Sequence, residues 1–183
     1  MQAGRIVQRF RATDKREVVL RTPRWEDLDD LLEMISSLVN EKADIAKAEQ
    51  VSRVEEVDWF ARALSHLEKG EVFYMVAEVE GKVVANSEIV MRQGGYDKHV
   101  GQVGIAIRDG YRDLGIGTEM MSKLIKEARR MGLRVLTLFA LESNKRAIHV
   151  YEKVGFVQTG RIPRKFLKQG KFLDEVIMTL LLE

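Results

Sequence analysis

The sequence predicts an α+β protein in which about four helices flank a mixed, mostly antiparallel sheet. Two observations lead to this prediction. Apolar residues recur at helical spacing between residues 22 and 70, and strand patterns dominate after Gly70. A strand-loop-helix-strand stretch over residues 99–141 then has the form of a crossover between two parallel strands. The 183 residues contain no linker or repeat, which indicates a single domain over residues 17–183.

The N-terminal third is predicted to hold one strand and two helices. Residues 1–16 contain five basic residues and one Asp, and we interpret them as a basic leader, with a first strand as the alternative. A short strand follows at 17–21. The pair Thr22-Pro23 then favours a helix start, since Thr is a common cap and Pro suits the first helical position. The capping box Ser52-x-x-Glu55 opens the second helix.

The remaining elements follow from changes in periodicity and from turn residues. We expect six features in order: a hairpin, a third strand, an amphipathic helix, a continuous apolar strand, a helix that ends at a glycine, and a final strand pair. Their predicted ranges are 72–79 with 83–91, 99–107, 116–131, 134–141, 144–154, and 156–160 with 172–182.

Composition excludes several classes of function. The chain has no cysteine, so disulfides and thiolate metal sites are excluded, and its three histidines lie too far apart to predict a metal site. The net charge of +2 is too small to indicate a nucleic-acid partner. No apolar run reaches the ~20 residues that span a bilayer, and no secretory h-region is present. We therefore expect a cytoplasmic protein without a membrane or nucleic-acid partner; a homodimer stays open.

The most informative segment joins a predicted strand to a predicted helix. The loop between them contains Arg112-x-x-Gly115-x-Gly117, and the helix begins at once. Such a loop lets successive backbone N–H groups converge on one point, to which the helix dipole adds positive potential, so a diphosphate fits. The alternative is an ordinary glycine-containing helix entry. A P-loop is excluded by the missing Gly-Lys-Ser/Thr, and a dinucleotide fingerprint by Met120 at the third glycine position.

A second pattern lies downstream and reads Asn144-x-x-Ala147-x-x-x-Tyr151-x-x-x-Gly155-Phe156. Alone it is typical of a well-capped helix with a half-buried tyrosine. Together the two patterns resemble the GNAT family of N-acetyltransferases, from about residue 17 to the end of the chain. The tail from Gly155 to Asp174 resembles the branch that acetylates ribosomal-protein N-termini or polyamines.

The resemblance implies a GNAT-like fold in which strands 103–107 and 134–141 splay apart around the pantetheine arm. It implies transfer of an acetyl group from acetyl-CoA to a primary amine, either a peptide N-terminus or a small amine, without a metal. The residues that it assigns to coenzyme binding are Ile105, Ala106, Ile107, Arg112, Asp113, Leu114, Gly115, Ile116, Gly117, Thr118, Asn144 and Tyr151.

The chemistry of acyl transfer agrees with these roles. Attack of an amine on a thioester builds an oxyanion and then expels a thiolate. A tyrosine hydroxyl of ordinary pKa ~10 can protonate a thiolate of pKa ~8.5, which suits Tyr151. A strand-edge N–H, which we place at Ile107, can stabilise the oxyanion.

The general base is less defined. Relatives that acetylate protein N-termini have a Glu five residues before the Asn, where this chain has Phe139. Glu88, on a neighbouring strand, is the first candidate and Glu142 the second; each could equally be a solvated surface acid, and a water chain without a single acid is a further alternative.

Residues 161–171 form a basic connection of Arg161, Arg164, Lys165, Lys168 and Lys171. It could be a solvated hairpin or a positive rim. Such a rim repels polycations, so polyamines come last among the acceptors considered. The rival function is a non-catalytic coenzyme A sensor or interaction domain of the same fold. The acid-bearing Tyr151 favours the enzyme, whereas Phe139 in place of an acid favours the sensor.

Overall fold

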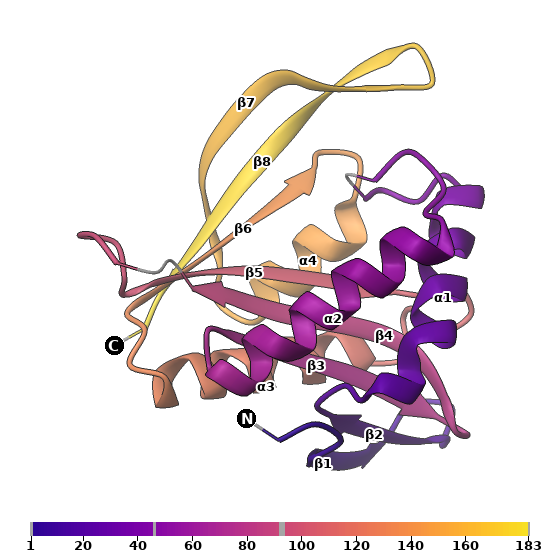
Figure 1. The fold of residues 1–183 in the computed structure, drawn as a ribbon. Helices are drawn as coiled ribbons and strands as arrows, with labels where there is room; N and C mark the ends of the chain where they lie inside the picture. Colours follow the sequence, from indigo (N-terminus) through magenta and orange to yellow (C-terminus); the bar gives the residue numbers. More distant parts are fainter. Residues whose placement is uncertain (1, 46, 92–93, 183) are drawn as a thin grey trace.

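The computed structural model describes residues 2–45, 47–91 and 94–182. Its eight strands form one sheet in the order β1-β2-β3-β4-β5-β6-β8-β7, with only β5 and β6 parallel (Figure 1). This is the mixed, mostly antiparallel sheet with four flanking α-helices that the sequence predicts. The elements are β1 Ile6–Arg11, β2 Glu17–Arg21, α1 Leu28–Asn40, α2 Arg53–Lys69, β3 Val72–Val79, β4 Lys82–Met91, β5 Val100–Ile107, α3 Ile116–Arg130, β6 Val135–Leu141, α4 Lys145–Lys153, β7 Val157–Lys168 and β8 Lys171–Leu181.

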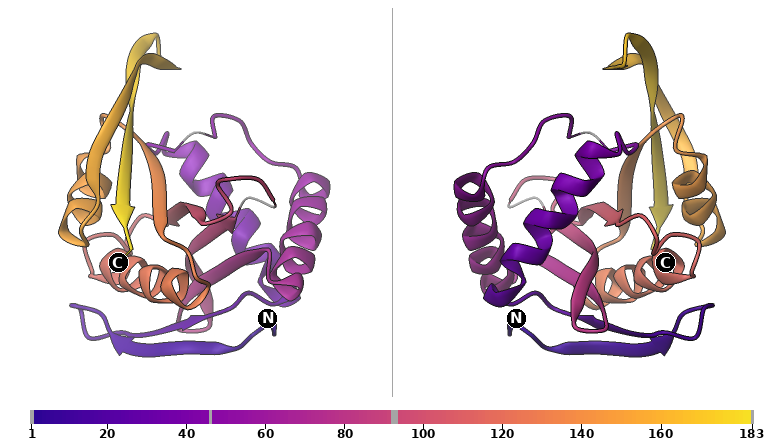
Figure 2. Two further views of the ribbon diagram at one scale, coloured as in Figure 1. Left: turned by 90° about the vertical axis from the view of Figure 1, so that its left-hand side faces the viewer. Right: turned by 90° about the vertical axis from the view of Figure 1, so that its right-hand side faces the viewer.

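The sheet separates two apolar clusters, each covered by a pair of helices. Alternate side chains of β3, such as Tyr74 and Val76, pack with α1 and α2, while Phe73 and Met75 pack with α3 on the other face. Figure 2 shows the two helix pairs on opposite sides of the sheet. We refer to these sides as the α1–α2 face and the α3–α4 face.

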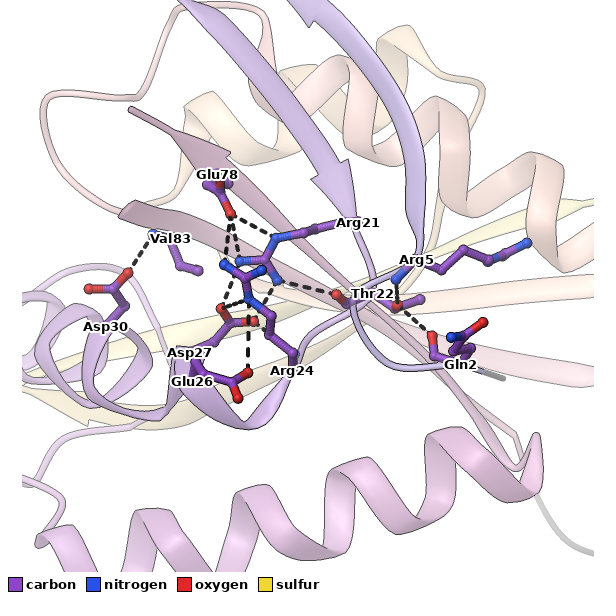
Figure 3. Close-up of polar contacts among 10 residues, drawn as sticks. All are labelled: Gln2, Arg5, Arg21, Thr22, Arg24, Glu26, Asp27, Asp30, Glu78 and Val83. Atoms are coloured by element: carbon purple, nitrogen blue, oxygen red, sulfur yellow. Dashed lines mark hydrogen bonds and ion pairs between the residues drawn. The ribbon is translucent and has the colours of Figure 1, made fainter. Parts of the chain in front are cut away.

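The start of α1 differs from the prediction. Instead of a helix capped by Thr22, a short 3-10 turn spans Trp25–Asp27 and α1 begins at Leu28. The cause is a buried ion pair: Arg21 donates to both carboxylate oxygens of Asp27 at 2.6 and 2.7 Å, and also pairs with Glu78 (Figure 3). The hydroxyl of Thr22 accepts a hydrogen bond from the backbone N–H of Arg5 instead of capping the helix.

Part of the predicted basic leader is a strand of the sheet. Residues 6–11 form β1, which pairs antiparallel with β2 and places Val7 and Phe10 against the core. The pattern is not a simple alternation, because the register shifts between Ile6 and Gln8, so that Val7 and Phe10 both reach the core although they are three residues apart. The Gln8 amide also donates to Glu119 of α3 at 3.2 Å. The boundary at residue 17 stays a prediction.

Strands β5 and β6 pair over a short length and then separate. Their parallel pairing joins Val100–Gln102 to Val135–Thr137 and continues no further among the described residues. Within this paired stretch Gly101 has no room for a side chain, since a Cβ there would stand 2.8 Å from side-chain atoms of Ile89 and Leu133. Beyond this point the edges of the two strands diverge, as the resemblance implied.

The C-terminal hairpin is longer than predicted. The basic segment expected to connect two strands lies mostly within β7, which extends to Lys168, and the turn is only Gln169-Gly170. Pairs such as Phe166 with Leu173 continue the ladder through this segment. The hairpin of β7 and β8 consequently projects beyond the rest of the sheet (Figure 1).

Candidate active site

A cavity of about 1080 Å³ occupies the space where β5 and β6 diverge. Its walls come from β5, β6, the loop after β5, helix α4, the segment between α1 and α2, and the C-terminal hairpin. All of the predicted coenzyme-binding residues line it except Leu114 and Ile116. Those two side chains instead pack into the core, Ile116 fully buried, and so fix the loop that precedes α3.

The loop from Arg112 to Thr118 has the backbone geometry of an anion site. Asp113 and Gly115 both adopt left-handed backbone conformations, with φ of 61° and 82°, separated by one residue. Alternation of this kind turns successive N–H groups toward one side. Gly115 is the N-cap of α3 and supplies no side-chain cap, so the first N–H groups of the helix lack an intrahelical partner. The loop therefore presents N–H groups and a helix dipole to the cavity.

Arg112 and Asn144 are held by neighbouring groups at the cavity wall. Arg112 Nε donates to the carbonyl of Ile107 at 3.0 Å, and its guanidinium pairs with Glu41. Asn144 caps α4 as predicted, because its Oδ1 accepts from Ala147 N at 3.2 Å. Its amide donates to the carbonyl of Asp44, also at 3.2 Å. Both side chains thus contact the segment that follows α1.

Tyr151 projects from α4 into the region between the cavity and the core. It is 7% exposed and its ring packs against Phe156, with ring centroids 6.3 Å apart. Its hydroxyl has no hydrogen-bond partner among the described residues. Burial raises the pKa of Tyr151 to about 12, because the phenolate would lose its hydration. The hydroxyl therefore keeps its proton, as a proton donor requires.

Glu88 belongs to β4, next to β5, and its side chain lies on the α1–α2 face. It stands opposite Gly104 in the sheet register, and its Oε1 would be 3.3 Å from a Cβ at that position. Gly104 lines the cavity, whereas Glu88 itself is outside the lining residues. Burial raises the pKa of Glu88, since no cation compensates for the lost hydration. A carboxylate in this position is a stronger base than one in water.

Glu142, the second candidate base, is occupied by structural contacts. Its carboxylate accepts from the Asp174 backbone N–H at 3.1 Å and pairs with Arg161. It is also absent from the cavity lining. Its place is at the root of the C-terminal hairpin, where it joins β6 to β8. Phe139, five residues before Asn144, is 44% exposed and lines the cavity, so the wall there is aromatic instead of acidic.

Sequence reasoning missed one acid at the cavity. Glu175 of β8 lines the cavity and is only 8% exposed. The strand pattern of 172–182 made it an ordinary strand residue, and no spacing motif singles it out. Its proximity to the cleft depends on the pairing of β8 with β6, which places Glu175 opposite Leu141.

The basic rim is partly neutralised. Arg161 pairs with Glu142 and, at 2.8 Å, with Asp174, while Lys168 pairs with Asp44. Arg164 stacks over the ring of Phe172. In the described ranges no group of three or more His, Asp or Glu side chains is arranged to hold a metal ion. No helix within those ranges is both long and apolar enough to cross a membrane.

Comparisons with known proteins agree on one family. The sequence profile of the acetyltransferase (GNAT) family matches residues 27–156. Among curated proteins, YwnH of Bacillus subtilis, named as a candidate phosphinothricin acetyltransferase, is 26% identical over 88% of this chain and 97% of its own length. The L-amino acid N-acyltransferase MnaT of Escherichia coli is 29% identical over 47% of this chain and 50% of its length.

Solved structures show the same fold. An acetyltransferase structure, yncA of Salmonella typhimurium with its cofactor acetyl-CoA, superposes with a TM-score of 0.80 at 23% identity, covering 91% of this chain and 94% of that one. A ribosomal-protein-alanine N-acetyltransferase from Brucella melitensis gives a TM-score of 0.78 at 24% identity, covering 89% and 99%. At these identities the likeness concerns the fold alone.

Proposed function

Because the chain belongs to the acetyltransferase (GNAT) family, we propose that this acetyl-CoA-dependent N-acetyltransferase acetylates the α-amino group of a free amino acid. The family membership and the use of acetyl-CoA decide between an enzyme and a mere coenzyme sensor. The amino-acid acceptor is supported by the names of the sequence relatives, which act on phosphinothricin or on L-amino acids.

The observation that carries the proposal is the cavity between the diverging strands. The loop from Arg112 to Thr118, with its backbone N–H groups, forms part of the cavity wall. Tyr151 also lines the cavity, and its hydroxyl has no hydrogen-bond partner among the described residues. Acetyl-CoA, when bound, supplies the activated acyl group. The loop amides then hold the diphosphate, and the unpaired edge of β5 from Ile105 to Ile107 pairs with the pantetheine arm. These assignments support an orientation in which the thioester lies near α4.

The proposed reaction is direct transfer. The acceptor nitrogen forms the new C–N bond while the C–S bond of the thioester breaks. The acceptor attacks as the neutral amine, and Glu88 takes the proton that its nitrogen loses, directly or through water. Tyr151 gives its proton to the departing sulfur, and the proton held by Glu88 returns to Tyr151 through solvent. The N–H of Ile107 stabilises the oxyanion, and the hydrogen bond from Arg112 to the Ile107 carbonyl fixes the backbone in this place.

The resemblance of the tail from Gly155 to Asp174 predicts other acceptors, namely a peptide N-terminus or a polyamine. The likeness to ribosomal-protein acetyltransferases lies in the fold, whereas the names of the two sequence relatives refer to phosphinothricin and to L-amino acids.

The proposal is tested by supplying acetyl-CoA with separate L-amino acids, phosphinothricin, small amines and short peptides. Free thiol release gives the rate, and the mass of the product identifies the acetylated amine. We expect at least one free amino acid to be acetylated faster than any peptide N-terminus. Acetylation confined to peptides would contradict the acceptor class, and thiol release independent of every amine would contradict the transfer reaction.

A further inference from the structure

Glu175 is a buried carboxylate without a partner. Its residue is 8% exposed, it lines the cavity, and no described residue donates a hydrogen bond or an ion pair to it. Most of the side chain is buried, and the carboxylate is open only toward the cavity, where a cation would compensate for its reduced hydration. A group of this kind at a cavity wall indicates that the missing partner belongs to a ligand.

The sheet register places Glu175 on the side of the acceptor. Val176 and Met178 pack into the core of the α3–α4 face, so the alternation of a strand puts Glu175 on the α1–α2 face. Phe139 and Leu141 of β6 lie on that face and also line the cavity. Glu88 lies on the same face, but on β4, across the cleft from β8. The two acids therefore stand on opposite sides of the opening between β5 and β6.

Two cations of the C-terminal hairpin pair with other acids and not with Glu175. Arg161 pairs with Glu142 and Asp174, and Lys168 pairs with Asp44. At the other end of the cavity, Asp113 pairs with Arg146 at 3.4 Å. The acids that surround the cavity are thus matched by protein cations, and Glu175 differs from them in having none among the described residues.

We propose that Glu175 binds a second cationic group of the acceptor, so that the acceptor is a basic amino acid. Its side-chain cation pairs with Glu175 while its α-amino group is acetylated, and the rings of Phe139 and Phe166 beside it can add cation–π attraction. This inference rests on the proposed function, which it narrows from amino acids in general to those with a cationic side chain. The pairing of Arg161 and Lys168 with acids lowers the positive charge that a cationic acceptor meets at this side of the cavity.

The test compares L-arginine with L-citrulline, which have nearly the same shape but differ in the charge of the terminal group. In each of them only the α-amino group is available for acetylation. We expect kcat/KM to be roughly 10- to 100-fold higher for arginine, the range of one charge-assisted hydrogen-bonded contact. In Glu175→Gln, which keeps the size of the side chain, this ratio should fall to near one. The control Glu152→Gln, at an exposed position of α4, should keep the wild-type ratio.

Calorimetry of both amino acids against the enzyme saturated with coenzyme A measures binding without turnover. Equal acetylation of arginine and citrulline by the wild type overturns the inference and leaves the proposed function intact. An arginine preference that survives in Glu175→Gln overturns it as well. If no amino acid is acetylated but arginine binds in a Glu175-dependent manner, the subsite stands and the proposed reaction fails. Absence of both binding and acetylation of arginine overturns the subsite.

Discussion

Tyr151→Phe tests the proposed acid at one atom. The change keeps the ring that packs against Phe156 and removes only the hydroxyl, which has no partner among the described residues. If the hydroxyl protonates the leaving thiolate, turnover should fall while the binding of coenzyme A changes little. A core tyrosine without a chemical role would instead show its effect in stability.

The size of the kinetic effect follows from the raised pKa. A phenol with a pKa of about 12 donates its proton less readily than an ordinary tyrosine. Against a thiol of pKa ~8.5 the transfer is unfavourable by roughly 3.5 units, or ~5 kcal/mol, before ligand binding changes the surroundings. General acids contribute ~10²–10⁴-fold, and so weak an acid belongs at the lower end. We expect turnover in Tyr151→Phe to fall by ~10²-fold.

The stability of the variant should move in the opposite direction. The hydroxyl makes no hydrogen bond among the described residues, so Phe breaks none and makes the side chain more apolar, which can add up to about 1 kcal/mol. A gain of ~1 kcal/mol raises Tm by ~2–4 °C in a chain of this size. We therefore expect Tm to be unchanged or higher, whereas loss of a satisfied hydrogen bond would lower it.

One preparation of the variant answers both questions. Thiol release gives turnover per folded molecule, and thermal unfolding gives Tm. The wild-type profile of kcat/KM should also show no loss of activity from Tyr151 below about pH 11, because its proton stays bound up to a pKa of about 12. Full turnover combined with a lower Tm would refute the catalytic assignment and make Tyr151 a structural residue.

Three further changes give separable outcomes. Gly117→Asp should weaken coenzyme A binding at least ~10-fold relative to Gly117→Ala, because both place a Cβ 3.1 Å from Ile107 Cδ1 but only Asp adds charge at the anion site; equal affinities in a thermal-shift titration would contradict the assignment. In Glu88→Gln, kcat/KM and its low-pH limb should be lost. The pKa of Glu88 is higher in the folded than in the unfolded protein, so the wild type loses stability as pH rises above the pKa of Glu88 in the unfolded chain. Glu88→Gln carries no such charge and should be at least as stable as the wild type at pH 8. A lower Tm of the variant at that pH would contradict the direction of the pKa shift. Asp27→Ala leaves Arg21 without its main buried partner and should cost ~3 kcal/mol in urea unfolding, with retained activity in the folded fraction; a loss under ~1 kcal/mol would show that Glu78 alone suffices.

The fold was predictable where the local pattern and the tertiary role agree. The capping box Ser52-x-x-Glu55 forms as expected, with Ser52 N donating to Glu55 at 2.8 Å, and Gly70 ends α2 in the left-handed conformation. The prediction failed where distant partners decide. Thr22-Pro23 has the local form of a helix start, but the pairing of Arg21 with Asp27 delays the helix to Leu28.

The same distinction separates the parts of the site. The loop from Arg112 to Thr118 and the helix cap at Asn144 are each formed by residues close together in sequence, so the spacing of these residues alone predicts the local backbone geometry. Whether Glu88 or Glu142 faces the acceptor depends on contacts formed across the sheet. Glu142 pairs with Arg161, which is nineteen residues away and lies beside it only after β7 pairs with β8. No local pattern contains this information.

Glu175 illustrates what a strand register adds to a motif. In sequence it follows Asp174, and the two acids are equivalent by type and spacing. In the sheet their contacts differ. Asp174 forms an ion pair with Arg161 and accepts a hydrogen bond from the backbone N–H of Arg164, whereas Glu175 lines the cavity and makes neither contact. One acid therefore fixes the hairpin and the other keeps its capacity for a ligand cation. Because a strand alternates its faces, a shift of one residue in the pairing of β8 with β6, which places Glu175 opposite Leu141, would exchange these roles.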